Sequence, residues 1–235
     1  MLELINVHTY YGESFVLQGV SLKVEKDTVA ALLGRNGMGK TTTIRSIIGF
    51  TPPRRGVIRF KEKDITNLPS YQIAQMGIGL VPQGRHIFPM LSVEENLRLA
   101  LIGLPSVDIK AETQMAYEMF PRLGERKKQK GKTLSGGELQ MLAIARAIMG
   151  PTRLLLMDEP SEGLAPVVLT QIQKTVEELK ARNMTILLAE QNLQFALGMG
   201  DYFYIIDNGA IVFAGDKSSL DANKEVQLRY LGVGV

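Results

Sequence analysis

The sequence contains no cysteine and no long hydrophobic run. Without a thiol, a disulfide framework, a thiolate nucleophile and a cysteine-based metal site are all excluded. The lack of cysteine agrees with a cytoplasmic location. No apolar run approaches the ~20 residues that span a bilayer, and residues 1–4 lack the basic start of a signal peptide. We therefore expect no signal peptide, and we expect any role at a membrane to depend on a partner.

The sequence also carries little net charge. The 27 basic and 24 acidic side chains leave a formal net charge of +3 on 235 residues. Because so small an excess gives no electrostatic footprint for nucleic acid, we expect no nucleic-acid partner. The apolar fraction of 45% and the charged fraction of 22% are typical of a globular chain. The length fits one large domain or two small ones.

A glycine-rich stretch at residues 34–42 reads Gly-Arg-Asn-Gly-Met-Gly-Lys-Thr-Thr and fits the phosphate-binding pattern G-x-x-x-x-G-K-[ST]. A strand-like apolar run precedes it and a helical pattern follows, which is the context that the pattern requires. Lys40 can reach the β and γ phosphates, and the Thr41 hydroxyl can hold Mg²⁺. A glycine-rich turn with a chance lysine is the alternative, but the pattern would arise by chance only ~1% of the time. The stretch predicts a nucleoside-triphosphate site.

Hydrophobic periodicity predicts the elements around this loop. The expected strands are at residues 2–7, 16–24, 29–33, 57–60, 77–83, 154–158 and 185–189, and a hairpin with an Asn-Gly turn is expected at 202–213. The expected helices are at residues 70–76, 108–120 (ending at Pro121) and 167–182, with a loop at 83–89 that exposes an Ile-Phe pair. Residues 92–150 are helical in pattern and contain no strand. We therefore expect an α/β protein with an inserted helical segment.

Two carboxylates end one of the buried strands. Four apolar residues lead directly to Asp158 and Glu159. Asp158 can hold Mg²⁺ through water as the carboxylate partner of Thr41, and Glu159 can accept a proton from an attacking water. Acidic pairs at strand ends are often only solvated, yet the phosphate loop earlier in the chain favours the functional interpretation.

Three further features allow two interpretations each. Residues 134–140, Leu-Ser-Gly-Gly-Glu-Leu-Gln, place Ser135 and Glu138 as a capping box, and their glycines form either a plain helix cap or a second anion cradle. Gln83 is either a solvated loop residue or a side chain directed toward Mg²⁺. Tyr11 either packs locally, which the local pattern favours, or stacks on a base.

The order of these motifs along the chain closely resembles the nucleotide-binding domain of ATP-binding cassette (ABC) proteins, over essentially the whole length. The resemblance implies a single domain, residues 1–235, with a P-loop (RecA-like) core. An N-terminal antiparallel β subdomain and an inserted α-helical subdomain at about residues 85–150 complete it. In that family two domains pair head to tail, and each ATP lies between one phosphate loop and the other subunit's Leu-Ser-Gly-Gly-Glu signature.

The resemblance also implies roles for individual residues. Tyr11 resembles the aromatic residue that stacks on adenine, and Glu159 resembles the general base. The phosphate cradle would be Asn36, Gly37, Met38, Gly39, Lys40, Thr41 and Thr42, and the γ-phosphate contacts made in trans would be Ser135, Gly136 and Gly137. The Mg²⁺ shell would be Thr41, Gln83 and Asp158. Residues 83–89 would receive a helix from a transmembrane partner.

Two positions depart from the common family pattern. Gln191 stands where most members carry a switch histidine, and Ala165 stands where an aspartate is usual. A neutral amide can hydrogen-bond a γ-phosphate but carries no imidazolium charge. Residues 85–89, 163–166, 190–192 and 230–233 resemble the LivF-type ATPase of branched-chain amino-acid importers. A related urea/amide importer ATPase is similar in the same places.

The resemblance implies an ATPase subunit that binds ATP and Mg²⁺ and powers a membrane transporter. Its expected partners are a second ABC ATPase subunit, in a homo- or heterodimer, two transmembrane permease subunits, and an extracytoplasmic solute-binding protein. Its expected location is peripheral, on the cytoplasmic face of the inner membrane. A non-transport ABC ATPase of translation or DNA repair is the alternative, although such proteins carry two domains or a long coiled coil. A phosphate-loop kinase would leave residues 134–140 unexplained.

Overall fold

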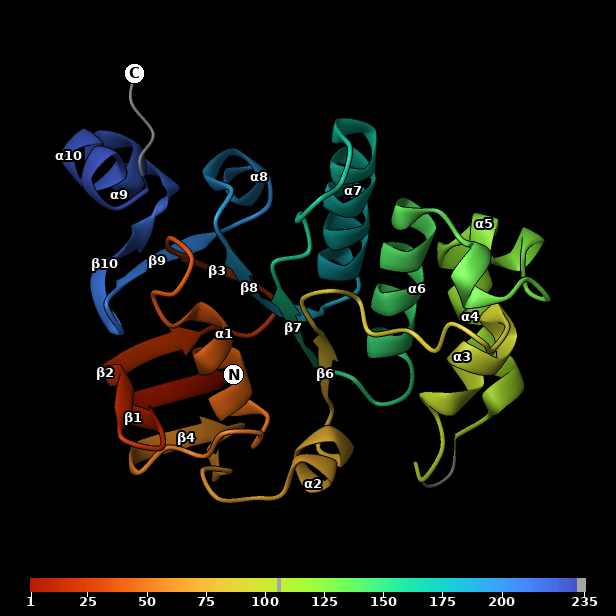
Figure 1. The fold of residues 1–235 in the computed structure, drawn as a ribbon, viewed down its shortest axis with the longest axis horizontal. Coiled ribbons are helices and arrows are strands. Elements are labelled where there is room, and N and C mark those ends of the chain that lie inside the picture. The colour runs from red at the N-terminus through yellow and green to blue at the C-terminus, as the bar shows by residue number, and fades with distance from the viewer. Residues whose placement is uncertain (105–106, 232–235) are drawn as a thin grey trace.

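A computed structural model describes residues 1–104 and 107–231, so residues 232–233 of the terminal segment noted above lie outside it. Two sheets and the helices around them make up the fold (Figure 1). The smaller sheet is antiparallel, with strand order β2-β1-β4-β5. Its strands are β1 Leu2–Tyr11, β2 Ser14–Val24, β4 Arg55–Phe60 and β5 Lys63–Asp64.

The larger sheet has the order β10-β9-β3-β8-β7-β6, and all its neighbours are parallel except the terminal hairpin. Its strands are β3 Val29–Leu33, β6 Ile78–Val81, β7 Leu154–Asp158, β8 Thr185–Glu190, β9 Tyr202–Asp207 and β10 Ala210–Asp216. Strands β3, β7 and β8 are buried along their full length. That burial explains why each reads as an unbroken apolar run.

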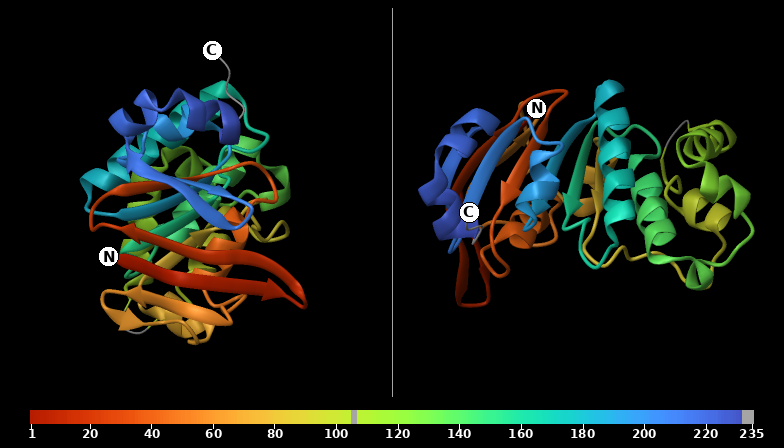
Figure 2. Two further views of the ribbon diagram at one scale, coloured as in Figure 1. Left: turned by 90° about the vertical axis from the view of Figure 1, so that its left-hand side faces the viewer. Right: turned by 90° about the horizontal axis from the view of Figure 1, so that it is seen from above.

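Alternate residues of these strands belong to two separate cores. Val29, Ala31 and Leu33 face the core formed with α6 (Gly136–Ile148), α7 (Pro166–Ala181) and α8 (Leu193–Leu197). Ala30 and Leu32 face the core that contains α1 (Lys40–Ile47) and the antiparallel sheet. Helix α1 therefore lies between the two sheets, directly after the phosphate loop (Figures 1 and 2).

The inserted segment lies at one end of the molecule, beyond α6 (Figures 1 and 2). It consists of α3 Val93–Leu99, α4 Ile109–Met119, α5 Pro121–Glu125 and η1 Gly131–Thr133, leading into α6. The capping box predicted at Ser135 is formed, and a second one is formed at Ser92. The α/β core, the antiparallel sheet and the helical insertion confirm the predicted fold class.

The remaining helices are α2 Ser70–Gln75, α9 Lys217–Ala222, α10 Lys224–Val226 and η2 Gln227–Leu231. No helix within the described ranges is long and apolar enough to cross a membrane. The β9–β10 turn has positive φ at Asn208 and Gly209, as the predicted Asn-Gly hairpin requires.

Several predicted bounds were wrong, each for a local reason. Strand β1 extends to Tyr11 rather than ending at residue 7, because a bulge at Asn6 (φ 49°) interrupts the alternation without ending the pairing. The helix predicted to end at Pro121 does end before it, at Met119, and Pro121 also starts α5 in the first-turn position, where its missing N–H costs nothing. Ile87 is not exposed, since it packs against the core, whereas Phe88 is exposed. Strand β6 ends at Val81, so Gln83 lies two residues beyond it.

Candidate active site

The phosphate loop joins the end of β3 to the start of α1, and two of its glycines have positive φ. Gly37 has φ 82° and Gly39, the N-cap residue of α1, has φ 113°. A Cβ atom on Gly39 would lie 2.9 Å from Leu17 Cδ2, so a side chain here would be strained in its backbone angle and would also displace the buried Leu17. The loop therefore curves tightly and presents backbone N–H groups at a helix N-terminus, which is an anion-binding arrangement.

Lys40 is the buried cation of this loop, with 3% of its side chain exposed. Its Nζ donates to the carbonyl oxygens of Gly34 at 2.8 Å and Arg35 at 3.0 Å. The same nitrogen lies 2.9 Å from Glu159 Oε1. The ammonium group thus spans the phosphate loop and reaches the acidic end of β7, so the two predicted motifs share one site.

The predicted metal ligands Thr41 and Asp158 are adjacent. Thr41 Oγ1 donates to Asp158 Oδ1 at 3.1 Å. Asp158 is only 4% exposed, and burial raises its pKa to about 6, against the lowering effect of the Thr41 hydrogen bond. A hydroxyl and a buried carboxylate are oxygen ligands that suit Mg²⁺, and a cation would compensate the buried charge. The residues present therefore fit the predicted ion.

Within the described ranges, no cluster of three or more His, Cys, Asp or Glu side chains could hold a metal on its own. A site made of Thr41 and Asp158 would therefore need further oxygen ligands from a bound molecule or from water. Nucleotide phosphates commonly provide such ligands to Mg²⁺.

Glu159 follows Asp158 in an unusual backbone conformation. Its φ is 48°, in the left-handed region that non-glycine residues rarely occupy and that costs about 1–3 kcal/mol. Its N–H donates to the Ala189 carbonyl at 2.9 Å, and its Oε2 accepts from Gln83 Nε2 at 3.2 Å. Because of this conformation the Glu159 side chain turns toward Lys40 and Gln83, beside the metal ligands.

The segment before the helical insertion connects the site to α6. Gln83 also donates to Glu162 Oε2 at 3.1 Å. Arg85, with φ 69°, donates to Gln140 Oε1 on α6 at 3.2 Å and to the Glu162 carbonyl at 3.2 Å. The loop after β6, the loop after β7 and helix α6 are therefore joined through these two side chains.

The signature segment (residues 134–140) lies at the N-terminus of α6 and does not reach the phosphate loop of its own chain. Ser135 accepts from Glu138 N, and Glu138 pairs with Arg126 at 2.6 Å. The signature glycines face residues around α7: a Cβ on Gly137 would lie 3.0 Å from Val168 Cγ2. Among the hydrogen bonds of residues 1–104 and 107–231, none links this segment to residues 34–42.

Tyr11 and Gln191 lie at the border of the site. Tyr11 is 41% exposed at the end of β1. Burial raises the pKa of its hydroxyl, the Thr51 and Thr42 side chains lower it, and the resulting pKa is below the ordinary value. Its hydroxyl is thus close to Thr42 of the phosphate loop, and the partial exposure of the side chain is compatible with stacking on a base. Gln191 is exposed, and its backbone N–H donates to Glu190 Oε2 at 3.0 Å.

Sequence reasoning missed three residues of this network: Arg85, Glu162 and Glu190. Glu190 ends β8 just as Asp158 ends β7, and these two strands are parallel neighbours. Because the carboxyl ends of adjacent parallel strands meet at one edge, this acidic strand end could have been recognised.

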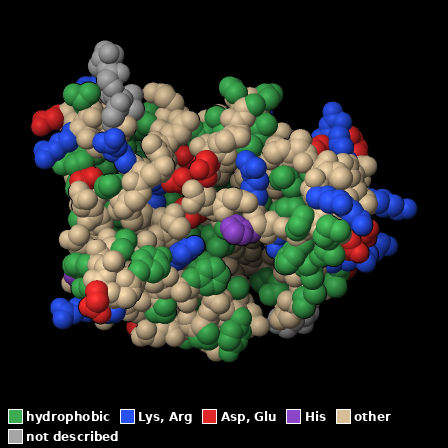
Figure 3. Space-filling model, in the orientation of Figure 1, with side chains coloured by type: hydrophobic (Ala, Val, Ile, Leu, Met, Phe, Trp, Pro, Cys, Tyr) green, Lys and Arg blue, Asp and Glu red, His purple; other side chains and the backbone are tan. Residues whose placement is uncertain are grey.

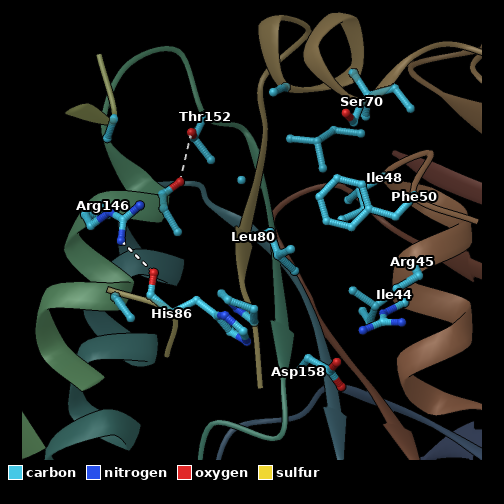
Figure 4. A pocket seen from close by; sticks show the side chains of 18 of the residues that line it. Ile44, Arg45, Ile48, Phe50, Ser70, Leu80, His86, Arg146, Thr152 and Asp158 are labelled. Carbon is cyan, nitrogen blue, oxygen red and sulfur yellow. Dashed lines mark hydrogen bonds between the residues drawn. The ribbon is translucent and has the colours of Figure 1, made fainter. Parts of the chain in front are cut away.

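A groove of about 740 Å³ opens beside the metal ligands. Figure 3 shows a hollow on this face with hydrophobic side chains around it. In Figure 4, Arg146 and Thr152 lie on one side, Ile44 and Phe50 lie on the other, and Asp158 lies at one end. The exposed aromatic residues Phe50 and Tyr71, each 62% exposed, belong to this groove.

Comparison with known proteins places the chain in a family. Residues 17–162 match the family described as "ABC transporter". The high-affinity branched-chain amino acid transport ATP-binding protein BraG of Pseudomonas aeruginosa is 41% identical, over 99% of this chain and all of BraG. The probable branched-chain amino acid transport ATP-binding protein LivF of Archaeoglobus fulgidus is 34% identical, over 99% of both chains.

Other relatives carry different names. The lipopolysaccharide export system ATP-binding protein LptB of Acidithiobacillus ferridurans is 33% identical, over 99% of this chain and 97% of LptB. Among solved structures, a nucleotide-free ATP-binding cassette from an ABC transporter superposes with a TM-score of 0.86 at 29% identity, covering 100% of this chain and 99% of that chain. Family match, full-length identity and shared fold agree: this chain belongs to the ABC transporter family, as an ATP-binding and ATP-hydrolysing subunit.

Proposed function

We propose that this ATPase powers the import of branched-chain or similar amino acids. The observation that carries the proposal is the 41% identity to BraG, which extends over both chains almost from end to end. The resemblance of residues 85–89, 163–166 and 190–192 to LivF-type subunits supports it. The substrate class is inferred from the names of the related proteins, because the transported solute would contact other subunits of the transporter and not this one.

The geometry supports a different role for each of the site residues. Lys40 and the backbone N–H groups of the phosphate loop would bind the phosphates and offset charge on the transferred group. Glu159, fixed by its left-handed backbone, would accept the proton of the attacking water. Thr41, Asp158 and Gln83 would hold Mg²⁺, which supplies charge compensation at the phosphates when bound. Tyr11 would stack on adenine.

The site would be completed by a second subunit. The signature segment of the chain contacts Val168 on α7, Arg126 and Arg85, and none of its hydrogen bonds within the described ranges reaches its own phosphate loop. Head-to-tail pairing would bring Ser135, Gly136 and Gly137 of one subunit to the γ-phosphate held by the other. The partner would be a second copy or a similar ABC ATPase subunit. We propose residues 1–235 as one such domain, with about residues 85–150 as its helical subdomain.

The groove supports docking of a permease helix. It combines exposed aromatic side chains with the basic side chains of Arg45, Arg85 and Arg146, and one end reaches Asp158. An amphipathic helix binds grooves of this character through its apolar face. Two permease subunits and a solute-binding protein outside the membrane would complete the transporter. The ATPase would then lie peripherally on the cytoplasmic face of the inner membrane.

Export is the second candidate, and the similarity to LptB is the observation that favours it. Purification of the chain with its native membrane partners, followed by reconstitution in vesicles, separates the two. We expect ATP turnover to rise when leucine, isoleucine or valine is supplied with the co-purified solute-binding protein. Stimulation by lipopolysaccharide alone, or by urea alone, would contradict amino-acid import.

A further inference from the structure

Glu190 is a buried carboxylate to which the mechanism above assigns no role. Its side chain ends β8 and is 1% exposed. No ion pair among the described residues includes it, so its charge is compensated by other groups. Burial raises the pKa of this carboxyl, and hydrogen bonds from the Ser161 side chain and from neighbouring backbone N–H groups oppose that effect. Retaining an acid here costs free energy, which calls for an explanation.

The hydrogen bonds of Glu190 connect three separate loops. Its Oε1 accepts from Ser161 N at 3.0 Å, in the loop after β7. Its Oε2 accepts from the N–H groups of Gln191 at 3.0 Å and Asn192 at 3.2 Å. Its backbone carbonyl accepts from Gly34 N at 3.2 Å, at the start of the phosphate loop. All of these donors are backbone groups, so the residue fixes the course of the chain itself.

These contacts bear on Glu159 in particular. The positive φ of Glu159 persists only if the chain is held on both sides of it. On one side Glu159 N is bonded to the carbonyl of Ala189, and two residues later Ser161 N is bonded to Glu190 Oε1. If the hydrogen bond between Ser161 N and Glu190 Oε1 were lost, Glu159 could relax to an ordinary backbone angle. Its carboxylate would then turn away from Lys40 and Gln83.

We propose that Glu190 is a positioning residue, whose carboxylate holds the loop after β7 against the Gln191–Asn192 segment and thereby keeps Glu159 in its reactive orientation. The inference rests on the proposed role of Glu159. Binding of nucleotide depends on the phosphate loop, which Glu190 contacts only through its backbone carbonyl. Loss of the side chain should therefore lower turnover and spare affinity.

The test compares Glu190→Gln with wild type and with Glu177→Gln, an exposed substitution of the same kind on α7. The glutamine amide would present an NH₂ group to the backbone N–H donors of one of the two loops. The hydrogen bonds to that loop would be lost, while the side chain keeps nearly the same volume. We expect kcat to fall about 10- to 100-fold, with the KM for ATP close to that of wild type. We also expect faster hydrogen–deuterium exchange at residues 159–163 and 190–193. Glu177→Gln should match wild type in every measurement.

A wild-type kcat in Glu190→Gln would overturn the proposal, as would a fall in kcat with unchanged exchange in both segments. If that variant does not fold, Glu190→Asp decides the question. It keeps the charge but is one methylene too short to reach both loops, so kcat should again fall while KM is retained. A wild-type kcat in Glu190→Asp would refute the need for both contacts. Because the exchange measurement needs no turnover, an inactive wild-type chain would count against the proposed function alone.

Discussion

Replacing Asp158 with asparagine should make the isolated subunit more stable while impairing nucleotide binding. Asp158 is 4% exposed, and burial raises its pKa from the ordinary 3.8 to about 6. Since one pKa unit corresponds to about 1.4 kcal/mol, this difference is equivalent to about 3 kcal/mol. At pH 8 the folded chain bears that cost in full, because the carboxylate is ionised in both the folded and the unfolded state.

The direction in which stability changes with pH follows from the linkage between proton binding and folding. The folded-state pKa lies above the unfolded one, so the folded state binds the proton more tightly, and its stability falls as pH rises from about 3.8 to about 6. Asparagine is neutral at every pH, has nearly the same shape, and still offers an oxygen to the Thr41 hydroxyl. Asp158→Asn should therefore stabilise the subunit at pH 8 by about 3 kcal/mol, which for a chain of this size raises the Tm by about 6–12 °C.

Thermal unfolding in the absence of nucleotide measures this effect, with Asp221→Asn on the exposed end of α9 as the matched control. The stabilisation should shrink to about half at pH 5, where wild-type Asp158 is largely protonated in the folded state. Addition of Mg-ATP should raise the Tm of wild type more than that of the variant. A variant no more stable than wild type at pH 8, or one with the same gain at both pH values, would refute the reasoning.

Three further substitutions probe other parts of the site. Lys40→Ala should abolish measurable ATP affinity by calorimetry, because it removes the cation of the phosphate loop; normal binding would argue against that assignment. Tyr11→Ala should weaken ATP binding by about 5- to 150-fold, the equivalent of ~1–3 kcal/mol of base stacking, whereas Tyr202→Ala, distant from this loop in sequence, should bind like wild type. Gln191→His should raise turnover and give it a new pH dependence near pH 6–7; an unchanged pH profile would exclude contact between this position and the γ-phosphate.

The sequence predicted the parts of the site that depend on short-range pattern. The phosphate loop lies between a strand and a helix as its motif requires, and Thr41 and Asp158, far apart in the chain, do meet. The capping box at Ser135 is formed as predicted, because a cap depends on residues only three positions apart. The buried strands β3, β7 and β8 were evident from their continuous apolar character.

What remained hidden depends on tertiary contacts. Nothing in the local sequence indicates that Glu159 adopts a positive φ, since that conformation is imposed by hydrogen bonds to Ala189 and from Ser161 to Glu190. The bonds from Arg85 to α6 and to the loop after β7 likewise join segments more than 50 positions apart. Ile87 was misjudged because its burial depends on the inserted helices folding over it.

The central claim is that each ATP site combines the phosphate loop of one subunit with the signature segment of another. Its most direct test is the ATP turnover of a mixture of two inactive variants, Lys40→Ala and Gly136→Asp, assembled with the permease pair. A Cβ on Gly136 would lie no closer than 3.8 Å to its neighbours, so the backbone at this position accepts a side chain, and we expect the carboxylate to act by repelling the phosphate. Mixed dimers would contain one intact site, and turnover should reappear on mixing. A mixture as inactive as its components would contradict the claim.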